Sequence, residues 1–463
     1  MFALCGAYRT RSEEDCIFMF KKALEEDADL AMKCLFYLAD CRGGQGERRF
    51  FRVCFKWLAQ EHPEIARKNL ELIPTYRRWD DVLYSCIDTP LAFDALTFIK
   101  KQFVLDTECK TPSLLAKWLP SENASSRETK RLGNIVREYL GMTHKQYRRA
   151  LSELRSRINI VEKLMSENRW EEIEFDKIPS YAGFIYKNAF AHKDIIAERY
   201  KEFLANKDTK VNARVLYPYQ CVAQATKYYD RFYKSFVPEE ERLAIEKYWN
   251  NLPDYFNGKQ SNMLCVVDTS GSMTGDKAAA PINIAISLGI YCAERAGGPF
   301  KDHYISFSSK PQLIKVEGID FVDKIWRIYK TNLCDDTNLE AVFDMLLKIA
   351  DRSDTKEEDI PETIVVISDM EINRMSYWES EEEAITNMQA IRKEWAAHGH
   401  KLPRLIYWNV DSRQNTILDS SPEISFVSGM SPSIFECIIT GKNGYDLMIE
   451  KLVNSGRYDH IQA

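Results

Sequence analysis

The sequence predicts a multidomain protein in which an all-α helical-repeat region precedes a doubly wound α/β region. The chain has 463 residues, which is too long for one ordinary hydrophobic core. Apolar residues recur at three- and four-residue spacing from about residue 10 to residue 250, as in amphipathic helices. Beyond 254–258, short apolar runs alternate with helical patterns. We therefore expect one domain over residues 1–257 and a second over residues 258–463.

The first region is expected to consist of helices joined by short turns. Glycine or proline interrupts the helical pattern at 42–46, 62–63, 73–74, 119–121 and 141. Successive helices without strands predict a HEAT-like α-solenoid or ring. Because the sequence has no clean repeat period, a helical bundle remains the alternative.

The second region is expected to alternate strands with helices. The predicted strands are 263–267, 303–307, 363–367 and 404–409, and the predicted helices are 278–296, 338–350 and 384–397. Such alternation is typical of a mostly parallel, Rossmann-like sheet with helices on both faces. Ligands bind such sheets beyond the carboxyl ends of their strands.

Composition is that of an ordinary globular protein, with 45% hydrophobic and 29% charged residues. Residues 1–16 lack a basic segment followed by an apolar run, and no stretch of about 18 apolar residues occurs. The 12 cysteines are scattered and form no CxxC pair, which favours reduced core thiols over disulfides or a zinc site. We expect a cytoplasmic protein that does not span a membrane.

Oxygen-bearing side chains follow the predicted strands at their carboxyl ends. A D-x-S-x-S element follows strand 263–267, an aspartate follows strand 363–367, and a threonine lies in the loop between them. Hard cations take about six oxygen ligands, and Mg²⁺ keeps several waters among them. The sequence predicts a site for one divalent cation, Mg²⁺, with Mn²⁺ or Ca²⁺ as alternatives. Its predicted ligands are Asp268, Ser270, Ser272, Thr337 and Asp369.

Other interpretations of these residues remain open. Asp268 and Ser270 can instead cap the following helix, and Thr337 or Asp336 the later one, through side-chain oxygens. Gly271 is expected to permit the sharp turn between the two serines. A nucleophilic serine lacks support, because there is no G-x-S-x-G element and no histidine placed as a base. We therefore expect no enzymatic activity.

The three elements resemble the metal-ion-dependent adhesion site (MIDAS) of von Willebrand factor A domains in order and strand placement. That resemblance implies direct contacts from the hydroxyls, aspartates that act largely through water, and an open position for an acidic group of a protein partner. One departure concerns the threonine, which is commonly preceded by glycine but here follows Asp335 and Asp336. This departure weakens the assignment of Thr337 and adds Asp336 as a candidate ligand.

Charge is divided unevenly, with a net +5 over residues 1–262 and −11 over residues 263–463. The stretch 117–157 is the most basic. Basic groups bind phosphates and neighbouring aromatic rings stack on unpaired bases, so this stretch predicts an RNA-binding surface. A solvated helix face is the alternative. The basic residues are Lys117, Arg127, Lys130, Arg131, Arg137, Lys145, Arg148, Arg149, Arg155 and Arg157, and the interleaved rings are Trp118, Tyr139 and Tyr147.

Helical repeats followed by a metal-binding A domain resemble the Ro (TROVE) ribonucleoprotein family. The strings at 40–49, 78–81, 116–123, 146–148 and 192–194 resemble still more closely an uncharacterised Ro-related family with the same two parts. The resemblance implies a ring or horseshoe closed by the A domain. It also implies that small structured RNAs bind the outer basic face and that single-stranded RNA ends bind in the central hole.

The resemblance and the charge pattern together predict the RNA contacts. For the arginines at 42, 48 and 49 the alternative is helix-end charge around a glycine turn, and for the histidine it is a buried neutral ring. The string Arg78–Asp81 is interpreted as a structural turn with Trp79 in the core. The predicted contacts are Arg42, Arg48, Arg49, Lys117, Lys130, Arg131, Arg137, Lys145, Arg148, Arg149, Arg155, His192 and Lys193.

The leading hypothesis is a non-catalytic, monomeric ribonucleoprotein component that binds small non-coding RNA through its helical half. The alternative is a metal-dependent protein–protein adaptor without RNA, in which the cation docks an acidic protein ligand. A third hypothesis is an accessory subunit of a molecular motor or chelatase. It requires an ATPase partner, because no G-x-x-x-x-G-K-[ST] element occurs in the chain.

Overall fold

The computed structural model describes most of the chain. The described residues are 1–158, 160–227, 229, 236–275, 279–331, 338–352, 354–370, 381–411, 424–441 and 444–463. Contacts divide the chain into two compact units. The helical unit comprises Met1, Ser12–Glu174 and Lys451–Ala463, and the sheet unit comprises Phe2–Arg11 and Phe175–Glu450.

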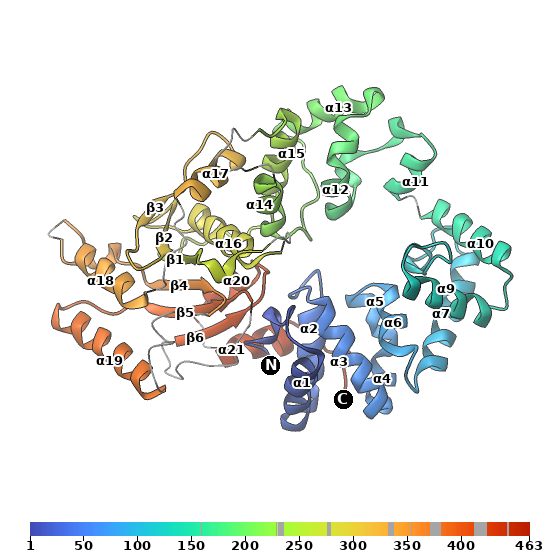
Figure 1. Cartoon of the computed structure of the whole chain (residues 1–463), viewed down its shortest axis with the longest axis horizontal. Coiled ribbons are helices and arrows are strands. Elements are labelled where there is room, and N and C mark those ends of the chain that lie inside the picture. Colours follow the sequence, from blue (N-terminus) through green and yellow to red (C-terminus); the bar gives the residue numbers. More distant parts are fainter. Residues whose placement is uncertain are drawn as a thin grey trace. The chain divides into compact units, whose positions relative to one another are not determined.

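In the helical unit, the described residues form helices and no strands; residues 12–174 are drawn from blue to teal in Figure 1. Side-chain caps begin several of them: Ser12 accepts from Asp15 N at 3.0 Å, and Thr143 with Gln146 forms a capping box. Its elements are α1 (Glu13–Glu26), α2 (Ala28–Ala39), α3 (Arg48–Glu61), α4 (Pro63–Asn69), η2 (Leu70–Leu72), α5 (Ile73–Tyr76), α6 (Trp79–Cys86), α7 (Ala92–Glu108), α8 (Leu115–Trp118), α9 (Arg127–Tyr139), α10 (His144–Arg157), α11 (Val161–Ser166) and η3 (Trp170–Glu172).

The last residues of the chain pack against α2 and α5. Tyr458 stacks on Tyr76 with ring centroids 5.5 Å apart, and its hydroxyl donates to buried Asp40 at 3.1 Å. Gly44 belongs to the glycine turn after α2, where a Cβ would lie 1.8 Å from the Tyr37 carbonyl oxygen. The glycines of the 40–49 string are therefore required in part by close backbone approach.

The sheet unit begins with helices that pack against the α/β part. Trp249 stacks on Phe321 with ring centroids 4.1 Å apart, and Arg242 forms a bidentate ion pair with Asp320 through two hydrogen bonds of 2.7 Å. The predicted boundary at 257 marks the change of secondary structure, whereas the contacts divide the chain at 174. The first helices are η1 (Cys5–Ala7), η4 (Phe175–Lys177), α12 (Ser180–Ala191), α13 (Asp194–Ala205), α14 (Pro218–Thr226) and α15 (Glu239–Asn250).

The α/β part confirms the predicted fold class. Within the described ranges six strands pair in the order β3-β2-β1-β4-β5-β6, all parallel except β3, which is antiparallel to β2. The strands β3 and β6 and the helix α17 had no counterpart among the predicted elements. The strands are β1 (Met263–Asp268), β2 (His303–Phe307), β3 (Leu313–Lys315), β4 (Thr363–Ser368), β5 (Arg404–Asn409) and β6 (Ile424–Ser428).

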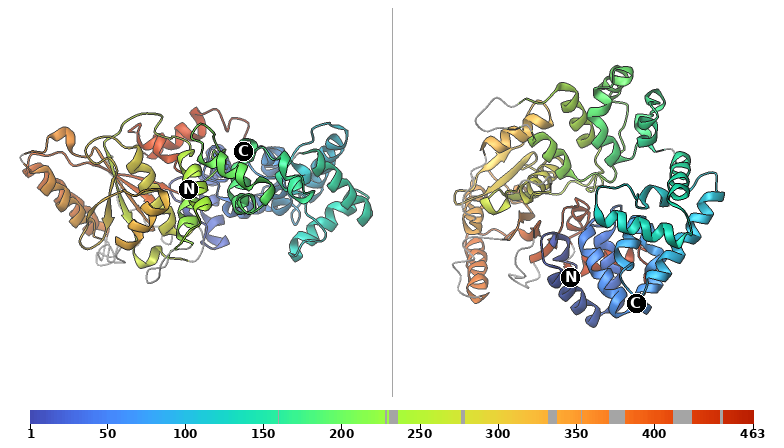
Figure 2. Two further views of the ribbon diagram at one scale, coloured as in Figure 1. Left: turned by 90° about the horizontal axis from the view of Figure 1, so that it is seen from above. Right: turned by 45° about the vertical axis from the view of Figure 1, so that its right-hand side comes forward.

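Helices cover both faces of this sheet. Along β1, Met263, Cys265 and Val267 face a core shared with α14, α16 and α17, whereas Leu264 and Val266 face α18 and α19. Figure 2 shows α18 and α19, in orange, together on one side of the sheet. The helices are η5 (Gly271–Met273), α16 (Pro281–Arg295), α17 (Phe321–Thr331), α18 (Leu339–Ala350), η6 (Glu357–Asp359), α19 (Glu381–Ala397), α20 (Ile434–Ile438), α21 (Gly444–Ile449) and η7 (Glu450–Asn454).

The cysteines that the structure describes lie mostly in the core. Burial raises the pKa of Cys16 to about 11 and that of Cys34 to about 12, so both thiols are protonated at neutral pH. Over the described ranges, no helix combines the length and the apolar character that a bilayer crossing demands.

Candidate functional site

The strands β1 and β4 end side by side at the point where the strand order reverses. Val267 pairs with Ile367, so Asp268 at the end of β1 and Ser368 at the end of β4 are neighbours. From β1 the connection runs outward to β2, whereas β4 lies on the other side of β1. In open parallel sheets this switch point is where loops diverge and ligands bind.

The Asp268 carboxylate is fully buried and held from two sides. Its Oδ1 accepts the Ser270 backbone N–H at 2.9 Å, and its Oδ2 accepts the Ser368 hydroxyl at 2.5 Å. The Ser368 oxygen in turn accepts the Met370 N–H at 3.0 Å. Because buried carboxylates are costly unless hydrogen-bonded, these bonds both stabilise the charge and orient it.

Two serine hydroxyls and a second aspartate complete the described part of the edge. The Ser270 and Ser272 Oγ atoms lie 3.0 Å apart. Asp369 is 1% exposed and directly follows β4. The next residue, Met370, has a φ of 66°, an unusual left-handed conformation for a residue with a side chain. Such strain occurs at ligand sites, where the surrounding structure maintains it.

The capping interpretation fails for the first element, because α16 begins after Ala280 and neither Asp268 nor Ser270 caps it. The later helix α18 is capped by Asn338, whose Oδ1 accepts the Ala341 N–H at 3.1 Å. The expectation for Gly271 was wrong: its backbone is not left-handed, and an added Cβ would meet nothing within 4 Å.

The donor set at this edge fits a hard divalent cation. The described groups are two hydroxyls and two buried carboxylates, all oxygen donors of the kind that Mg²⁺ and Ca²⁺ take. Among the described residues no group of three or more His, Cys, Asp or Glu side chains gathers as a metal site. Thr337, Asp335 and Asp336 lie outside the described residues.

The segment Phe2–Arg11 occupies the β5–β6 part of the same sheet edge. Thr10 donates its hydroxyl to Asp411 Oδ1 at 2.9 Å, and Arg9 donates to the Val410 carbonyl oxygen at 3.0 Å. The Gly6 N–H donates to Ser428 Oγ at 3.2 Å. Sequence reasoning missed this arrangement, although Asp411 after strand 404–409 repeats the signal that located Asp369.

Half of the basic stretch 117–157 is engaged by protein groups. Arg131 pairs with Asp88 and Glu128, and Arg137 pairs with Glu122 and Glu138. Three more basic side chains are engaged by protein groups. Lys117 pairs with Glu162 at 3.6 Å. Arg155 donates to Ala116 O and Leu119 O, and Arg157 donates to Thr107 O and Cys109 O. These side chains connect helices and loops of the helical unit.

The other half of the stretch is exposed. No carboxylate partner is present for these side chains within the part of the chain that the structure describes. They lie on α9 and α10 and are Arg127, Lys130, Lys145, Arg148 and Arg149. Of the interleaved rings, Tyr147 is buried and donates to the Pro120 carbonyl oxygen at 3.0 Å, so it cannot stack on a base.

The remaining predicted contacts differ in their availability. Arg42 is exposed and donates to the Thr75 carbonyl oxygen at 3.2 Å. His192 is exposed rather than buried, and its Nδ1 lies 2.7 Å from the Asn188 carbonyl oxygen. Arg49 and Lys193 are half-buried. Arg48 lies 2.6 Å from Asp80, within an ion-pair network.

That network surrounds two aspartates at the start of α6. Asp81 is fully buried, with Arg52 Nε at 2.5 Å, Arg48 Nε at 3.1 Å and Arg77 Nε at 3.2 Å. Burial alone raises the pKa of Asp81, but the three guanidiniums outweigh it and lower the pKa. Trp79 is half-buried and stacks on Phe98 at 5.0 Å.

Comparisons with known proteins place the chain in a family. Its helices match a family model for the domain of unknown function DUF2828 over residues 6–83 and 106–259, half of the chain. The chain belongs to the DUF2828 family. In this DUF2828 protein the sheet matches a second model, the domain of unknown function DUF7788, over residues 262–458.

Individual relatives of this DUF2828 protein span most of its length. The "Uncharacterized protein L728" of Acanthamoeba polyphaga mimivirus is 27% identical over 481 residues, which cover 94% of this chain and 81% of the relative. Among solved structures, the Ro (RSR) protein of Deinococcus radiodurans is 14% identical with a TM-score of 0.47, covering 94% of this chain and 93% of that chain.

Proposed function

We propose that this protein is a non-catalytic RNA-binding protein that holds one divalent cation, Mg²⁺, in its sheet unit. The observation that carries the RNA proposal is the group of exposed basic residues on α9 and α10 that have no carboxylate partner among the described residues. Exposed cations attract phosphates and release counterions on binding. The resemblance of the sequence strings to Ro-related proteins favours RNA as the polymer.

The cation proposal rests on the geometry at the ends of β1 and β4. Ser270 and Ser272 would contact the ion, and Asp268 and Asp369 would balance its charge, largely through water. A bound Mg²⁺ would supply a Lewis-acidic position at which a partner carboxylate binds. The chain's own contribution is the fixed carboxylate of Asp268, held by Ser368 at 2.5 Å.

The RNA proposal is tested by measuring affinity for a small structured RNA as a function of salt. The triple variant Lys130→Ala/Lys145→Ala/Arg149→Ala should bind more weakly. The logarithm of its association constant should also fall less steeply with the logarithm of salt concentration, by about 2 units of slope. The control Lys301→Ala/Lys310→Ala/Lys348→Ala removes the same charge from exposed positions of the sheet unit and should retain full affinity. Equal losses in both variants would contradict the proposal.

The cation proposal is tested by calorimetric titration of the full chain with Mg²⁺ and with Mn²⁺. Asp268→Asn should abolish binding, because it removes the buried negative charge while keeping the side chain's shape. The matched control is Asp411→Asn, a carboxylate 7% exposed at the same sheet edge but outside the predicted ligand set. No heat of binding in the unaltered protein, or equal affinity in Asp268→Asn, would refute the site.

A further inference from the structure

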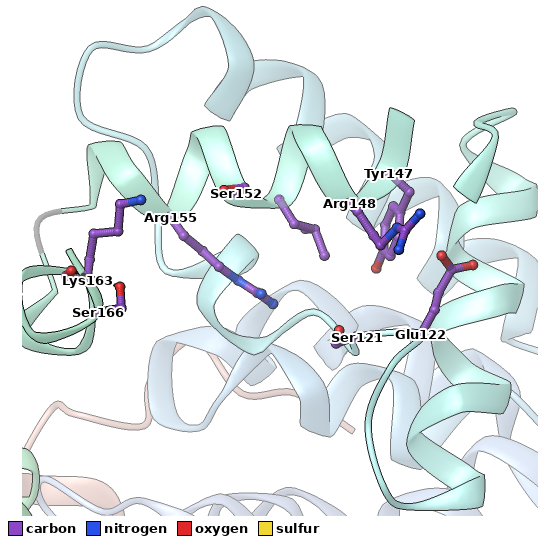
Figure 3. Close-up of a pocket in the computed structure, with 9 residues that line it drawn as sticks. Ser121, Glu122, Tyr147, Arg148, Ser152, Arg155, Lys163 and Ser166 are labelled. Atoms are coloured by element: carbon purple, nitrogen blue, oxygen red, sulfur yellow. Dashed lines mark hydrogen bonds between the residues drawn. The ribbon is translucent and has the colours of Figure 1, made fainter. Parts of the chain in front are cut away.

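A cavity of about 300 Å³ opens in the helical unit between α10, α11 and the segment that follows α8. Figure 3 shows Arg148 and Arg155 extending from α10, with Glu122 on one side of the cavity and Lys163 and Ser166 on the other. The volume lies at the small end of the usual range for ligand sites. It suits a single nucleotide rather than a folded polymer.

One face of α10 lines the cavity with donors. Arg148, Ser152 and Arg155 stand at positions i, i+4 and i+7, which lie on the same side of an α-helix. Ser121 and Ser166 line the cavity from the other segments, and the Ser166 hydroxyl donates to the Lys163 carbonyl oxygen at 2.9 Å. Guanidiniums and hydroxyls together form the donor set that phosphate oxygens accept from.

The Arg155 guanidinium is held by backbone carbonyl oxygens. Its Nε donates to the Ala116 carbonyl oxygen at 2.8 Å and its Nη2 to the Leu119 carbonyl oxygen at 3.1 Å, both neutral groups. Over the described ranges no carboxylate pairs with this half-buried guanidinium, and burial lowers its pKa. A cation that is partly removed from water without a counter-ion attracts an anion strongly.

The charged groups around the cavity differ in whether they have a partner of opposite charge. Glu122 is already compensated by Arg137 Nε at 2.8 Å, and His144 Nδ1 lies 2.8 Å from the same carboxylate oxygen. Lys163 is compensated by Glu167 at 2.6 Å. Arg148, like Arg155, has no carboxylate partner in the part of the chain that the structure describes, and its Nε donates to the His144 carbonyl oxygen at 3.3 Å. The cavity therefore carries net positive charge along α10.

We propose that this cavity binds the phosphate monoester of a nucleotide, with the phosphate between Arg148 and Arg155 and the nucleoside toward Glu122. A monoester carries nearly two negative charges, which match two guanidiniums. A phosphate at a chain end carries more negative charge than a phosphodiester within a strand and therefore matches the two guanidiniums better. The nucleotide is either free or the terminal residue of an RNA, and only the second source rests on the proposed RNA binding.

The test compares adenosine, adenosine monophosphate and one RNA oligonucleotide made with a 5′-phosphate, a 3′-phosphate or hydroxyls at both ends. Adenosine monophosphate should bind more tightly than adenosine. If RNA is the source, one phosphorylated oligonucleotide should bind about tenfold more tightly than the hydroxyl form. Arg148→Ala/Ser152→Ala should remove the advantage that the phosphate confers.

Arg149→Ala is the matched control, because it removes the same charge from the next position of α10, outside the cavity. It should weaken all RNA forms equally and leave the phosphate advantage intact. The inference is overturned if phosphorylated and hydroxyl ligands bind alike, even while RNA binding persists. Binding of adenosine monophosphate without any RNA binding would instead support the cavity and refute the proposed function.

Discussion

The basic stretch of the helical unit and the oxygen-lined edge of the sheet unit present their functional groups in opposite ways. The basic residues are close in sequence, yet the fold divides them into those that bridge protein segments and those that face solvent. The oxygen donors are up to 101 residues apart, yet β1 and β4 bring them to one edge. Sequence proximity is therefore a weaker guide to a shared site than strand topology.

The largest change in the free energy of unfolding is expected in the ion-pair network around Asp81. Asp81→Asn should lower the free energy of unfolding by about 3–5 kcal/mol, because three guanidiniums around a fully buried carboxylate lose their partner. Denaturant unfolding of the full chain measures this change. Asp94→Asn, which alters a half-exposed partner of Arg67 3.3 Å away, should cost under about 1 kcal/mol.

Acid provides a second measure of the same network. The arginines lower the pKa of Asp81 in the folded state below its pKa in the unfolded state. The stability that Asp81 contributes is therefore present above the unfolded-state pKa and is lost as the pH falls through the folded-state pKa. The helical unit should therefore lose stability below about pH 4. In Asp81→Asn this part of the pH dependence should disappear, and an unchanged acid profile would contradict the assignment.

Divalent cations should raise the stability of the sheet unit. Mg²⁺ at 100 times its dissociation constant should stabilise the sheet unit by about 2.7 kcal/mol, seen as a rise in its unfolding temperature. Ser270→Ala/Ser272→Ala should abolish that rise. Ser431→Ala/Ser433→Ala removes another hydroxyl pair, 2.8 Å apart, and should leave it intact. Loss of the rise in both variants would argue for a general loss of structure.

The smallest effect concerns pH near neutrality in the sheet unit. Hydrogen bonds to Glu357 at 2.9 Å and Asp351 at 3.2 Å raise the pKa of His400. The resulting stability is present below the unfolded pKa of about 6.5 and is lost as pH rises through the folded pKa. The unfolding temperature should therefore fall between pH 5.5 and 8.5. His400→Gln should remove this pH-dependent fall, whereas the control His192→Gln should retain it.

Much of the α/β part could be predicted, because its hydrophobic pattern is strong. The strands β2 and β5 have the predicted bounds, and the position of Asp369 beyond β4 followed from the parallel order. The strand β3 escaped prediction because it has three residues, of which Leu313 and Lys315 are exposed. Local patterns of that length carry too little hydrophobic contrast to separate strand from loop.

The sequence by itself determined the order of most helices and strands and the sheet edge where oxygen donors gather, since periodicity and strand ends are local properties. Only the tertiary structure decided which arginines are available and that Phe2–Arg11 packs beside β5 and β6. Those outcomes depend on partners such as Asp81 for Arg52 and Asp411 for Thr10. No local pattern specifies such partners, because an ion pair or a packed segment exists only once distant parts of the chain meet.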